Sequence, residues 1–428
     1  MDSTIHIIAI KSNRLEYVCH VLFNIILKKD FVIVDSISEC ANSNNIINYT
    51  SQKIDGCFNI TPSKLLYENS IEEQSINNDV WNNLPIIFTS ADSDLPFDIF
   101  AASFFLLSRY EEYLPSDTDN HNRFKPENSI AFKHNFIELP IVELWAKQLA
   151  KELNIEFPNK EFKKILTIDI DKAWKYKNNT FIRTLGAYLM YGLNGDFTNV
   201  IERLKVNLGI MPDPYDTFNI LRNINKKIEV RYFTLLSNKG KLDNATPHKK
   251  KAYRKLIKSL SKESQVGIHP SYESNSSFEI LKNEINILNN ITEAKVTNSR
   301  QHYLKSSYPK TFQNLLKLGI KHDYTMGWDS NVGFRASISI PFPFFDLSIN
   351  SQTELTFVPF AAMDCSLKDY MGLSKPDALK KLNELKQITK EVGGNFCLLC
   401  HNHSFSEYYD WKGWSSIFHE ILEVKQIT

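Results

Sequence analysis

From residue 165 onward, short apolar runs alternate with helical patterns, and this alternation limits the possible folds more than any other feature. Strand-like runs occur near residues 165–170, 229–236, 265–269, 295–301, 319–323, 354–360 and 395–400. Amphipathic stretches separate most of them, at residues 249–260, 277–288, 310–318, 376–392 and 414–424. Strands that alternate with helices predict a parallel α/β sheet, either closed as a barrel or open. In both forms, functional residues gather at the carboxyl ends of the strands.

A smaller α/β unit precedes this region. Its expected strands and helices lie at residues 5–10, 14–27, 31–34, 84–89 and 98–113, with Asp98 as the N-cap of the last helix. We interpret residues 108–113 as the solvated side of that helix rather than a binding face. A helix at 140–153 and a polar break mark the boundary. The sequence therefore predicts an N-terminal domain at residues 1–155 and a second domain at 160–428.

The first strand of the second domain ends in two carboxylates. Residues 165–172 read Ile-Leu-Thr-Ile-Asp-Ile-Asp-Lys, so Asp169 and Asp171 lie two positions apart. In a strand, such residues share a face and are about 6.6 Å apart. Two close carboxylates are costly to bury unless they share a cation or a proton. The pair therefore suggests a metal ligand beside a general base; the plainer alternative is a strand that runs into a polar loop.

Three further runs end in imidazole or guanidinium groups. His269 ends one run, Arg300 and His302 end another, and His401 follows the last. A single histidine is more often structural, but four strand ends of this kind indicate one crevice. Imidazole and carboxylate are ligands for zinc or a similar divalent ion. If the strand that holds Arg300 continues, His302 shares its face.

These motifs, in this order, resemble the polysaccharide deacetylase family, the NodB-homology domains of carbohydrate esterase family 4. The resemblance covers residues 160–428 and implies a distorted, TIM-like (β/α) barrel of about seven parallel strands. The matching stretches are Thr167-Ile168-Asp169-Ile170-Asp171, His269-Pro270-Ser271, Ser299-Arg300-Gln301-His302, residues 323–327 and 333–337, and Leu399-Cys400-His401. The preceding part is similar to an uncharacterised domain fused to such proteins in Bacteroidetes.

The resemblance assigns a role to each of these residues. It implies Asp169 as catalytic base, Arg300 as the residue that orients it, and His401 as general acid. It implies Asp171 and His269 as ligands of a divalent metal ion, with zinc expected and nickel or cobalt as alternatives. The family's adjacent acids are Asp-Ile-Asp here, so the two acids could exchange roles.

The family's second histidine is replaced by Glu273 in this sequence. The third metal ligand is then either His302 or Glu273, and we favour His302 because it would share the strand face of Arg300. The implied activity is metal-dependent removal of N-acetyl groups from an amino sugar or polysaccharide. The alternatives are a non-catalytic glycan-binding protein on the same fold, or an amidase acting on a non-sugar C–N bond. Six aromatic residues in the loops could either stack on sugar rings or pack the loops, with packing expected for half of them or more: Trp174, Trp328, Phe344, Phe345, Trp411 and Trp414.

Composition narrows the remaining function classes. Fifty basic residues against 49 acidic ones give a net charge of +1, which provides no global field to attract nucleic acid or an anionic membrane. The first residues lack the pattern of a signal peptide, and the most apolar window, at 97–107, is too short to span a bilayer. We therefore expect a soluble, cytoplasmic protein without a transmembrane segment. The sequence does not indicate an oligomeric state.

Overall fold

The computed structural model describes residues 4–40, 45–179, 181–195, 197–237, 240 and 242–425. Within these residues, nine strands form the largest sheet, which is parallel except for the antiparallel pair β12–β13. In sheet order the strands are β12 (Phe342–Asp346), β13 (Ser351–Phe357), β11 (His322–Asp323), β10 (Asn298–Ser299), β9 (Gln265–His269), β8 (Glu229–Leu235), β7 (Lys163–Ile170), β15 (Asn395–His401) and β14 (Ala362–Met363).

The predicted parallel α/β sheet is confirmed, but its strand count differs from the expected seven. Each predicted run overlaps an observed strand, although β10 and β11 have only two residues each. The sequence reading missed β12 and β14. Strand β7 is buried from Ile165 to Ile170, as expected for a parallel strand covered on both faces.

The large sheet is strongly curved. Strands β13 and β14 lie at opposite ends of its parallel part, seven strand spacings apart, yet residues 358–361 connect them directly. A flat sheet would separate them by roughly 34 Å, whereas this connection reaches about 18 Å at most. The connection also bonds to other parts of the sheet, since Ala361 N donates to Cys397 O at 2.8 Å and Phe360 N to Met326 O at 3.1 Å. The sheet therefore curls until its ends approach one another.

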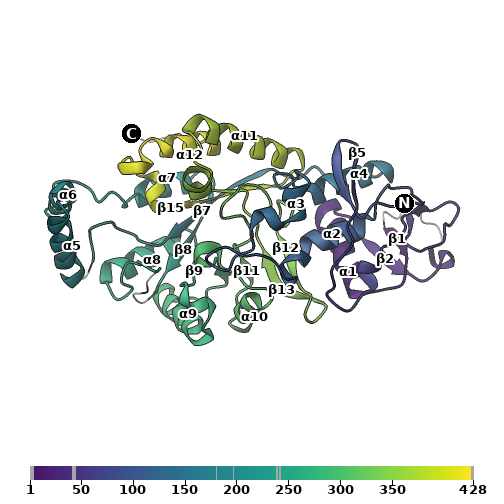
Figure 1. Cartoon of the computed structure of the whole chain (residues 1–428), viewed down its shortest axis with the longest axis horizontal. Helices are drawn as coiled ribbons and strands as arrows, with labels where there is room; N and C mark the ends of the chain where they lie inside the picture. The colour runs from purple at the N-terminus through teal and green to yellow at the C-terminus, as the bar shows by residue number, and fades with distance from the viewer. Residues whose placement is uncertain are drawn as a thin grey trace.

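Helices follow most strands of this sheet and lie outside it. Figure 1 shows α11 and α12 along one side and α8, α9 and α10 along the other. Their bounds are α5 (Phe181–Leu193), α6 (Phe197–Asn207), α7 (Phe218–Asn225), α8 (Lys251–Glu263), α9 (Phe278–Thr292), α10 (Lys310–Lys317), α11 (Lys375–Glu391) and α12 (Trp414–Leu422). Within the described ranges, no helix has the length and apolar character needed to cross a membrane.

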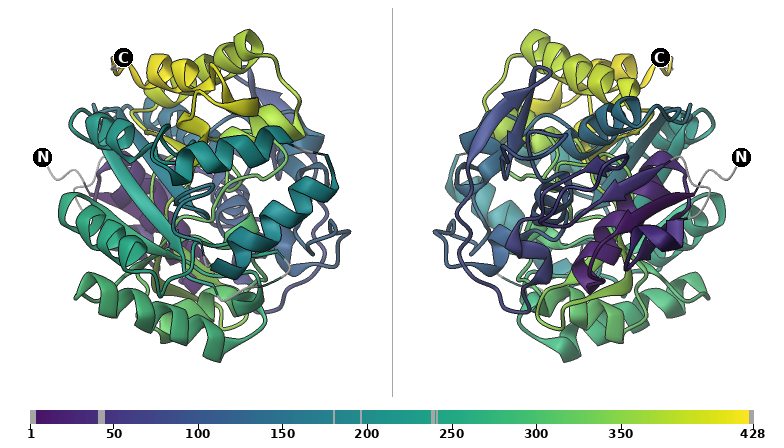
Figure 2. Two further views of the ribbon diagram at one scale, coloured as in Figure 1. Left: turned by 90° about the vertical axis from the view of Figure 1, so that its left-hand side faces the viewer. Right: turned by 90° about the vertical axis from the view of Figure 1, so that its right-hand side faces the viewer.

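The N-terminal region forms its own small sheet, in the order β2-β1-β3-β4 (Figure 2, right). Asp98 caps α2 as predicted, because its carboxylate accepts from Phe100 N and Ala101 N. The elements are β1 (Ile5–Ile8), α1 (Asn13–Cys19), a π-helix (His20–Leu27), β2 (Phe31–Val34), β3 (Ile46–Asn48), β4 (Phe58–Asn59), β5 (Asn78–Trp81), β6 (Leu84–Ile87), α2 (Ile99–Leu107), α3 (Ile130–Lys133) and α4 (Ile141–Glu152).

The interpretation of residues 108–113 as a solvated helix face is wrong. Helix α2 ends at Leu107, and Arg109 and Tyr110 are fully buried. Arg109 adopts a left-handed backbone conformation with φ of 52°, which turns the chain inward. Its side chain and that of Arg335 both pair with Glu112. Burial opposes the charged carboxylate, but the two guanidinium groups hold the pKa of Glu112 below its usual value.

The N-terminal region shares a hydrophobic core with the large sheet. The rings of Phe104 and Phe345 lie 5.1 Å apart, and Tyr17 Oη donates to Pro343 O at 2.8 Å. Glu143 accepts from both Ser339 N and Ser339 Oγ. The division into domains at 1–155 and 160–428 stays a prediction, and any boundary there crosses an extensive buried interface.

The Arg109–Glu112–Arg335 group leads to a stability prediction. We expect Glu112→Ala to lower the free energy of unfolding by about 3–5 kcal/mol, because two buried guanidinium groups lose their shared carboxylate. Urea denaturation measures the change. Glu138→Ala is the matched control, since Glu138 pairs with Lys381 at the partly exposed surface and should cost about 1 kcal/mol or less. Equal effects of the two substitutions would contradict this account of the buried group.

Candidate active site

The carboxyl ends of β7, β9 and β15 and the loop after β10 line one pocket of about 380 Å³. This volume lies within the range of small-ligand sites in proteins. The pocket contains five of the six sequence-predicted site residues, and the sixth, Arg300, contacts Asp169 directly. Its lining residues are Arg123, Asp169, Asp171, His269, Gln301, His302, Tyr303, Leu304, Met363, Cys365, Asp369, Tyr370, His401 and His403.

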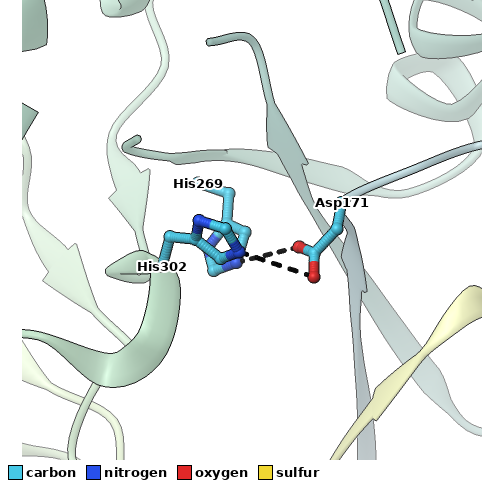
Figure 3. A group of neighbouring side chains, drawn as sticks. All are labelled: Asp171, His269 and His302. Atoms are coloured by element: carbon cyan, nitrogen blue, oxygen red, sulfur yellow. Dashed lines mark ion pairs between the residues drawn. The ribbon is translucent and has the colours of Figure 1, made fainter. Parts of the chain in front are cut away.

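Asp171, His269 and His302 form a compact group in which one ligand atom from each lies within 4.8 Å of the others. His269 Nε2 is 3.3 Å from Asp171 Oδ1, and His302 Nε2 is 3.6 Å from Asp171 Oδ2. Figure 3 shows both rings directed at this carboxylate. Two imidazoles and a carboxylate are a donor set that suits a catalytic zinc site, which keeps a fourth position open.

The far sides of both rings are fixed by hydrogen bonds. His269 Nδ1 lies 2.6 Å from Arg300 O, and His302 Nδ1 lies 2.7 Å from Asp243 Oδ1. In the neutral form of each ring, donation from Nδ1–H leaves the Nε2 lone pair directed into the pocket, as in metal-binding histidines. Burial favours neutral His302, but the carboxylates of Asp171 and Asp243 raise its pKa to about 9.

Asp171 also has unused capacity to bind a ligand. Its Oδ1 atom is buried and accepts no hydrogen bond within the described part of the chain. Burial opposes its charge, yet His302, His269 and His401 hold the pKa of Asp171 well below its usual range. An orphaned buried oxygen beside two oriented imidazoles fits a divalent cation, so the residues present match the metal that the sequence predicts.

Asp169 is held by a different set of contacts. Arg300 Nη1 lies 3.0 Å from Asp169 Oδ1, and both side chains are almost fully buried. Arg300 is fixed in turn, because Nη2 donates to Thr167 Oγ1 at 2.8 Å and Nε donates to Tyr324 O at 2.9 Å. The second oxygen of Asp169 is 3.6 Å from His269 Nε2. Arg300 therefore leaves one carboxylate oxygen directed toward the pocket.

His401 faces the group from β15. Its Nε2 is 3.6 Å from Asp171 Oδ2, and its Nδ1 is 2.9 Å from Asp364 Oδ1. Asp364 also accepts from His401 N and Ser404 Oγ, so its position is fixed. Burial disfavours the imidazolium, but Asp364 raises the pKa of His401 well above its usual value. His401 is thus a protonated, positioned imidazole beside two carboxylates.

The strand-face reason for placing His302 near Arg300 is wrong. Strand β10 ends at Ser299, and His302 begins a short 3₁₀ turn in which Tyr303 has φ of 60°. The turn, rather than a continuing strand, brings His302 to Asp171. Glu273, the alternative ligand, lines a separate pocket with Asp243 and Glu284.

Of the two alternatives for the aromatic residues in the loops, the structure has the packed one. Trp174, Trp328, Trp411, Trp414, Phe344 and Phe345 are all at most 9% exposed, so they pack the loops. The aromatic side chains that line the pocket are Tyr303 and Tyr370, and Tyr370 is half exposed. Cys397 and Cys400 are free cysteines buried in β15.

One side chain of the pocket comes from the N-terminal region, a contribution that the sequence did not indicate. Arg123 lines the pocket, and its Nη1 donates to Tyr303 O at 2.8 Å. Its charge is balanced by Asp119 and Asp329, at 2.6 and 2.5 Å from Nη2. The N-terminal region therefore fixes the backbone of the turn that carries His302.

Sequence comparison identifies only the N-terminal region. Residues 4–158 match the model of a family of unknown function, DUF7033. A search of curated proteins found no match. The fusion of this region to deacetylases, expected from the sequence, is not tested by these findings.

Solved structures similar to the chain include polysaccharide deacetylases. The Mycobacterium smegmatis protein is 13% identical, with 63% of this chain and 85% of that chain covered and a TM-score of 0.39. The Pseudomonas aeruginosa PAO1 protein is 8% identical, with 62% and 84% covered and a TM-score of 0.37. A 4-alpha-glucanotransferase from Thermococcus litoralis is 12% identical, with 62% and 37% covered and a TM-score of 0.37. At TM-scores below 0.5, these likenesses decide neither fold nor function.

Proposed function

We propose that the chain is a metal-dependent hydrolase that removes N-acetyl groups from an amino sugar or polysaccharide, on a distorted (β/α) barrel. One observation carries the proposal: three side chains that could hold a cation lie between an arginine-held carboxylate and an aspartate-held imidazole. Amide hydrolysis requires a group that takes a proton from water and a group that gives one to the leaving amine. The pocket places a candidate for each task, Asp169 and His401, beside the three candidate metal ligands.

Asp171, His269 and His302 would hold the ion, with zinc as the expected metal. When bound, such an ion polarises the amide carbonyl and lowers the pKa of water. Asp169 takes the proton of the attacking water, and Arg300 orients this carboxylate. His401 gives its proton to the departing amine, and Asp364 stabilises the charged ring before transfer. The positions of these residues around one pocket support the roles that the resemblance implies.

Acetate release tests the activity. Purified protein supplied with zinc, nickel or cobalt is expected to release acetate from N-acetylated oligosaccharides. Small non-sugar amides serve as the comparison, because hydrolysis of those alone would favour the amidase alternative. Glycan binding without acetate release under any of these metals would instead indicate a binding protein.

The ligand set makes a separate prediction about metal affinity. We expect His302→Ala to weaken zinc binding at least about tenfold, because the imidazole lies in the cation group. Glu273→Gln is the matched control and should leave affinity near that of the wild type, since Glu273 lines another pocket. Competition titration with a chromogenic chelator measures both. A larger loss of zinc affinity in Glu273→Gln than in His302→Ala would show that Glu273 is the third metal ligand.

A further inference from the structure

Opposite edges of the His401 ring face two different groups of side chains. Its Nε2 lies 3.6 Å from Asp171 Oδ2 in the candidate active site. Its Nδ1 lies 2.9 Å from Asp364 Oδ1 and 3.8 Å from Cys365 Sγ. One ligand atom from each of Asp364, Cys365 and His401 lies within 4.8 Å of the others. The proposed hydrolysis uses Asp364 and His401 but gives no role to Cys365.

The end of the large sheet brings this second group together. Strands β14 and β15 are parallel neighbours, and Met363 is the register partner of Leu399. The same register, continued for two residues, places Cys365 beside His401, in agreement with the contact between their side chains. At this point the chain enters a π-helix (Ser366–Tyr370), and Cys365 is its N-cap residue. Segments of π-helix are rare and often occur at functional sites.

Hydrogen bonds fix the positions of the donor atoms in this group. Asp364 Oδ1 accepts from Cys365 N at 2.7 Å, and Asp364 Oδ2 accepts from His401 N at 2.7 Å. Ser366 Oγ donates to Asp329 O at 2.5 Å, which anchors the backbone next to Cys365. None of these contacts involves the Nδ1 edge of His401, so a cation bound at Nδ1 leaves them intact.

The distances within the group suit a tetrahedral zinc ion. Zinc–sulfur bonds of about 2.3 Å and zinc–nitrogen bonds of about 2.05 Å, at tetrahedral angles, place sulfur and nitrogen roughly 3.6 Å apart. The observed separation of Cys365 Sγ and His401 Nδ1 is 3.8 Å. The separation of His401 Nδ1 and Asp364 Oδ1 is 2.9 Å, the length of a hydrogen bond, and would widen to about 3.4 Å around zinc. Cys365 and His401 both line the pocket, so a cation from solvent can reach them.

The charge around the group favours a cation. Asp171 and Asp364 flank the two edges of the His401 ring. The basic side chains on this side of the pocket are already paired with acids: Lys368 with Asp369, and Arg123 with Asp119 and Asp329. Burial raises the pKa of the Cys365 thiol to about 12, and Asp364 adds to this shift. The thiol is therefore neutral until a cation replaces its proton.

We propose that Asp364, Cys365 and His401 form a second cation site, which takes zinc or a similar thiophilic divalent ion. Binding replaces the proton of Cys365 Sγ and the proton of His401 Nδ1 by bonds to the cation, so two protons are released and no oxidant or reductant is needed. The consequence for catalysis rests on the proposed function. His401 keeps only its Nε2 proton, which a metal-bound imidazole gives up less readily than an imidazolium does, so the second cation inhibits the hydrolase.

Cobalt titration of the metal-free full chain tests the site, because a cobalt–thiolate bond adds a charge-transfer absorption in the near ultraviolet. Wild-type protein is expected to develop this absorption with one cobalt ion per chain, and excess zinc should remove it. Cys365→Ser should lose the absorption and weaken cobalt binding at this site at least about tenfold, because serine keeps the shape of the side chain but not the soft donor.

Two variants serve as controls for the cobalt titration. Cys57→Ser removes another partly buried free cysteine, in the N-terminal region, and should leave the absorption unchanged. His302→Ala should also keep the absorption, because His302 belongs to the Asp171 group and not to the second one. The proposal is overturned if the wild type shows no absorption, if Cys365→Ser retains it, or if either control loses it.

Acetate release tests the consequence for catalysis separately. Zinc beyond the first equivalent is expected to lower kcat of the wild type at least about tenfold, because it weakens the general acid. Cys365→Ser should be inhibited much less, and equal inhibition of the two proteins would overturn the inhibitory role. A protein that releases no acetate at any zinc concentration would contradict the proposed hydrolysis, whereas the cobalt absorption would still decide whether the second site exists.

Discussion

Asp169→Asn is expected to lower kcat for acetate release at least about 10²-fold while the protein keeps its metal. The amide has almost the shape of the carboxylate but cannot accept the proton of water. Asp169 is not part of the cation group, and Arg300 holds its Oδ1 at 3.0 Å. The substitution therefore separates proton transfer from metal binding. Acetate assays and elemental analysis of the same preparation measure the two effects.

A second aspartate in the pocket provides the control for this experiment. Asp369 lines the same pocket, but its side chain is about half exposed and pairs with Lys368 at 2.7 Å. Asp369→Asn should therefore retain activity close to that of the wild type. If Asp169→Asn loses the metal while Asp171→Asn keeps it, the two acids have the opposite roles.

The positions of several site residues were predictable because strand ends are visible in the sequence. Apolar runs mark strands, and parallel neighbours end at the same edge of a sheet. In the structure, His401 is the register partner of Asp169, and His269 is the partner of Leu235 at the end of β8. A polar residue that ends one run is thus brought beside polar residues that end the next.

The residues that support the site were not predictable in this way. Asp243 contacts His302 from 59 positions away in the chain, and it lies in a loop without periodicity. Asp364 follows β14, a strand of two residues that is too short to produce a pattern. A carboxylate four residues after the end of the sixth apolar run was the one available signal for Asp364.

Contacts between the N-terminal region and the rest of the chain could not be predicted from the sequence either. Segment 108–113 has the charge pattern of an exposed helix, since it reads Ser-Arg-Tyr-Glu-Glu-Tyr. Its burial depends on Arg335, more than 200 residues later, which supplies the second guanidinium for Glu112. Likewise, nothing near Arg123 indicates that it bonds to Tyr303 O in the pocket. The local sequence pattern predicts secondary structure, but it does not indicate which distant residues a side chain will contact in the folded chain.

His401→Ala is expected to slow amide hydrolysis by roughly 10²–10⁴-fold, the usual contribution of a general acid. An amine leaves poorly without a proton, whereas a phenolate leaves more easily. Loss of His401 should therefore harm an activated acetate ester much less than an N-acetyl sugar. Measuring kcat on both substrates distinguishes a lost acid from a distorted pocket, because distortion would slow both reactions alike.

The pH profile tests the same assignment through Asp364. Burial opposes charge on His401, and Asp364 at 2.9 Å raises its pKa, so the ring starts the reaction protonated. Activity should fall as the pH rises through that pKa, because the acid loses its proton. Asp364→Asn removes the negative charge, lowers the pKa of His401, and should move the alkaline limb of kcat to lower pH. Ser404→Ala is the control, since it removes a neutral partner of Asp364 and leaves the charge beside His401 in place. An alkaline limb that stays unmoved in Asp364→Asn would show that His401 is not the group whose protonation limits the reaction.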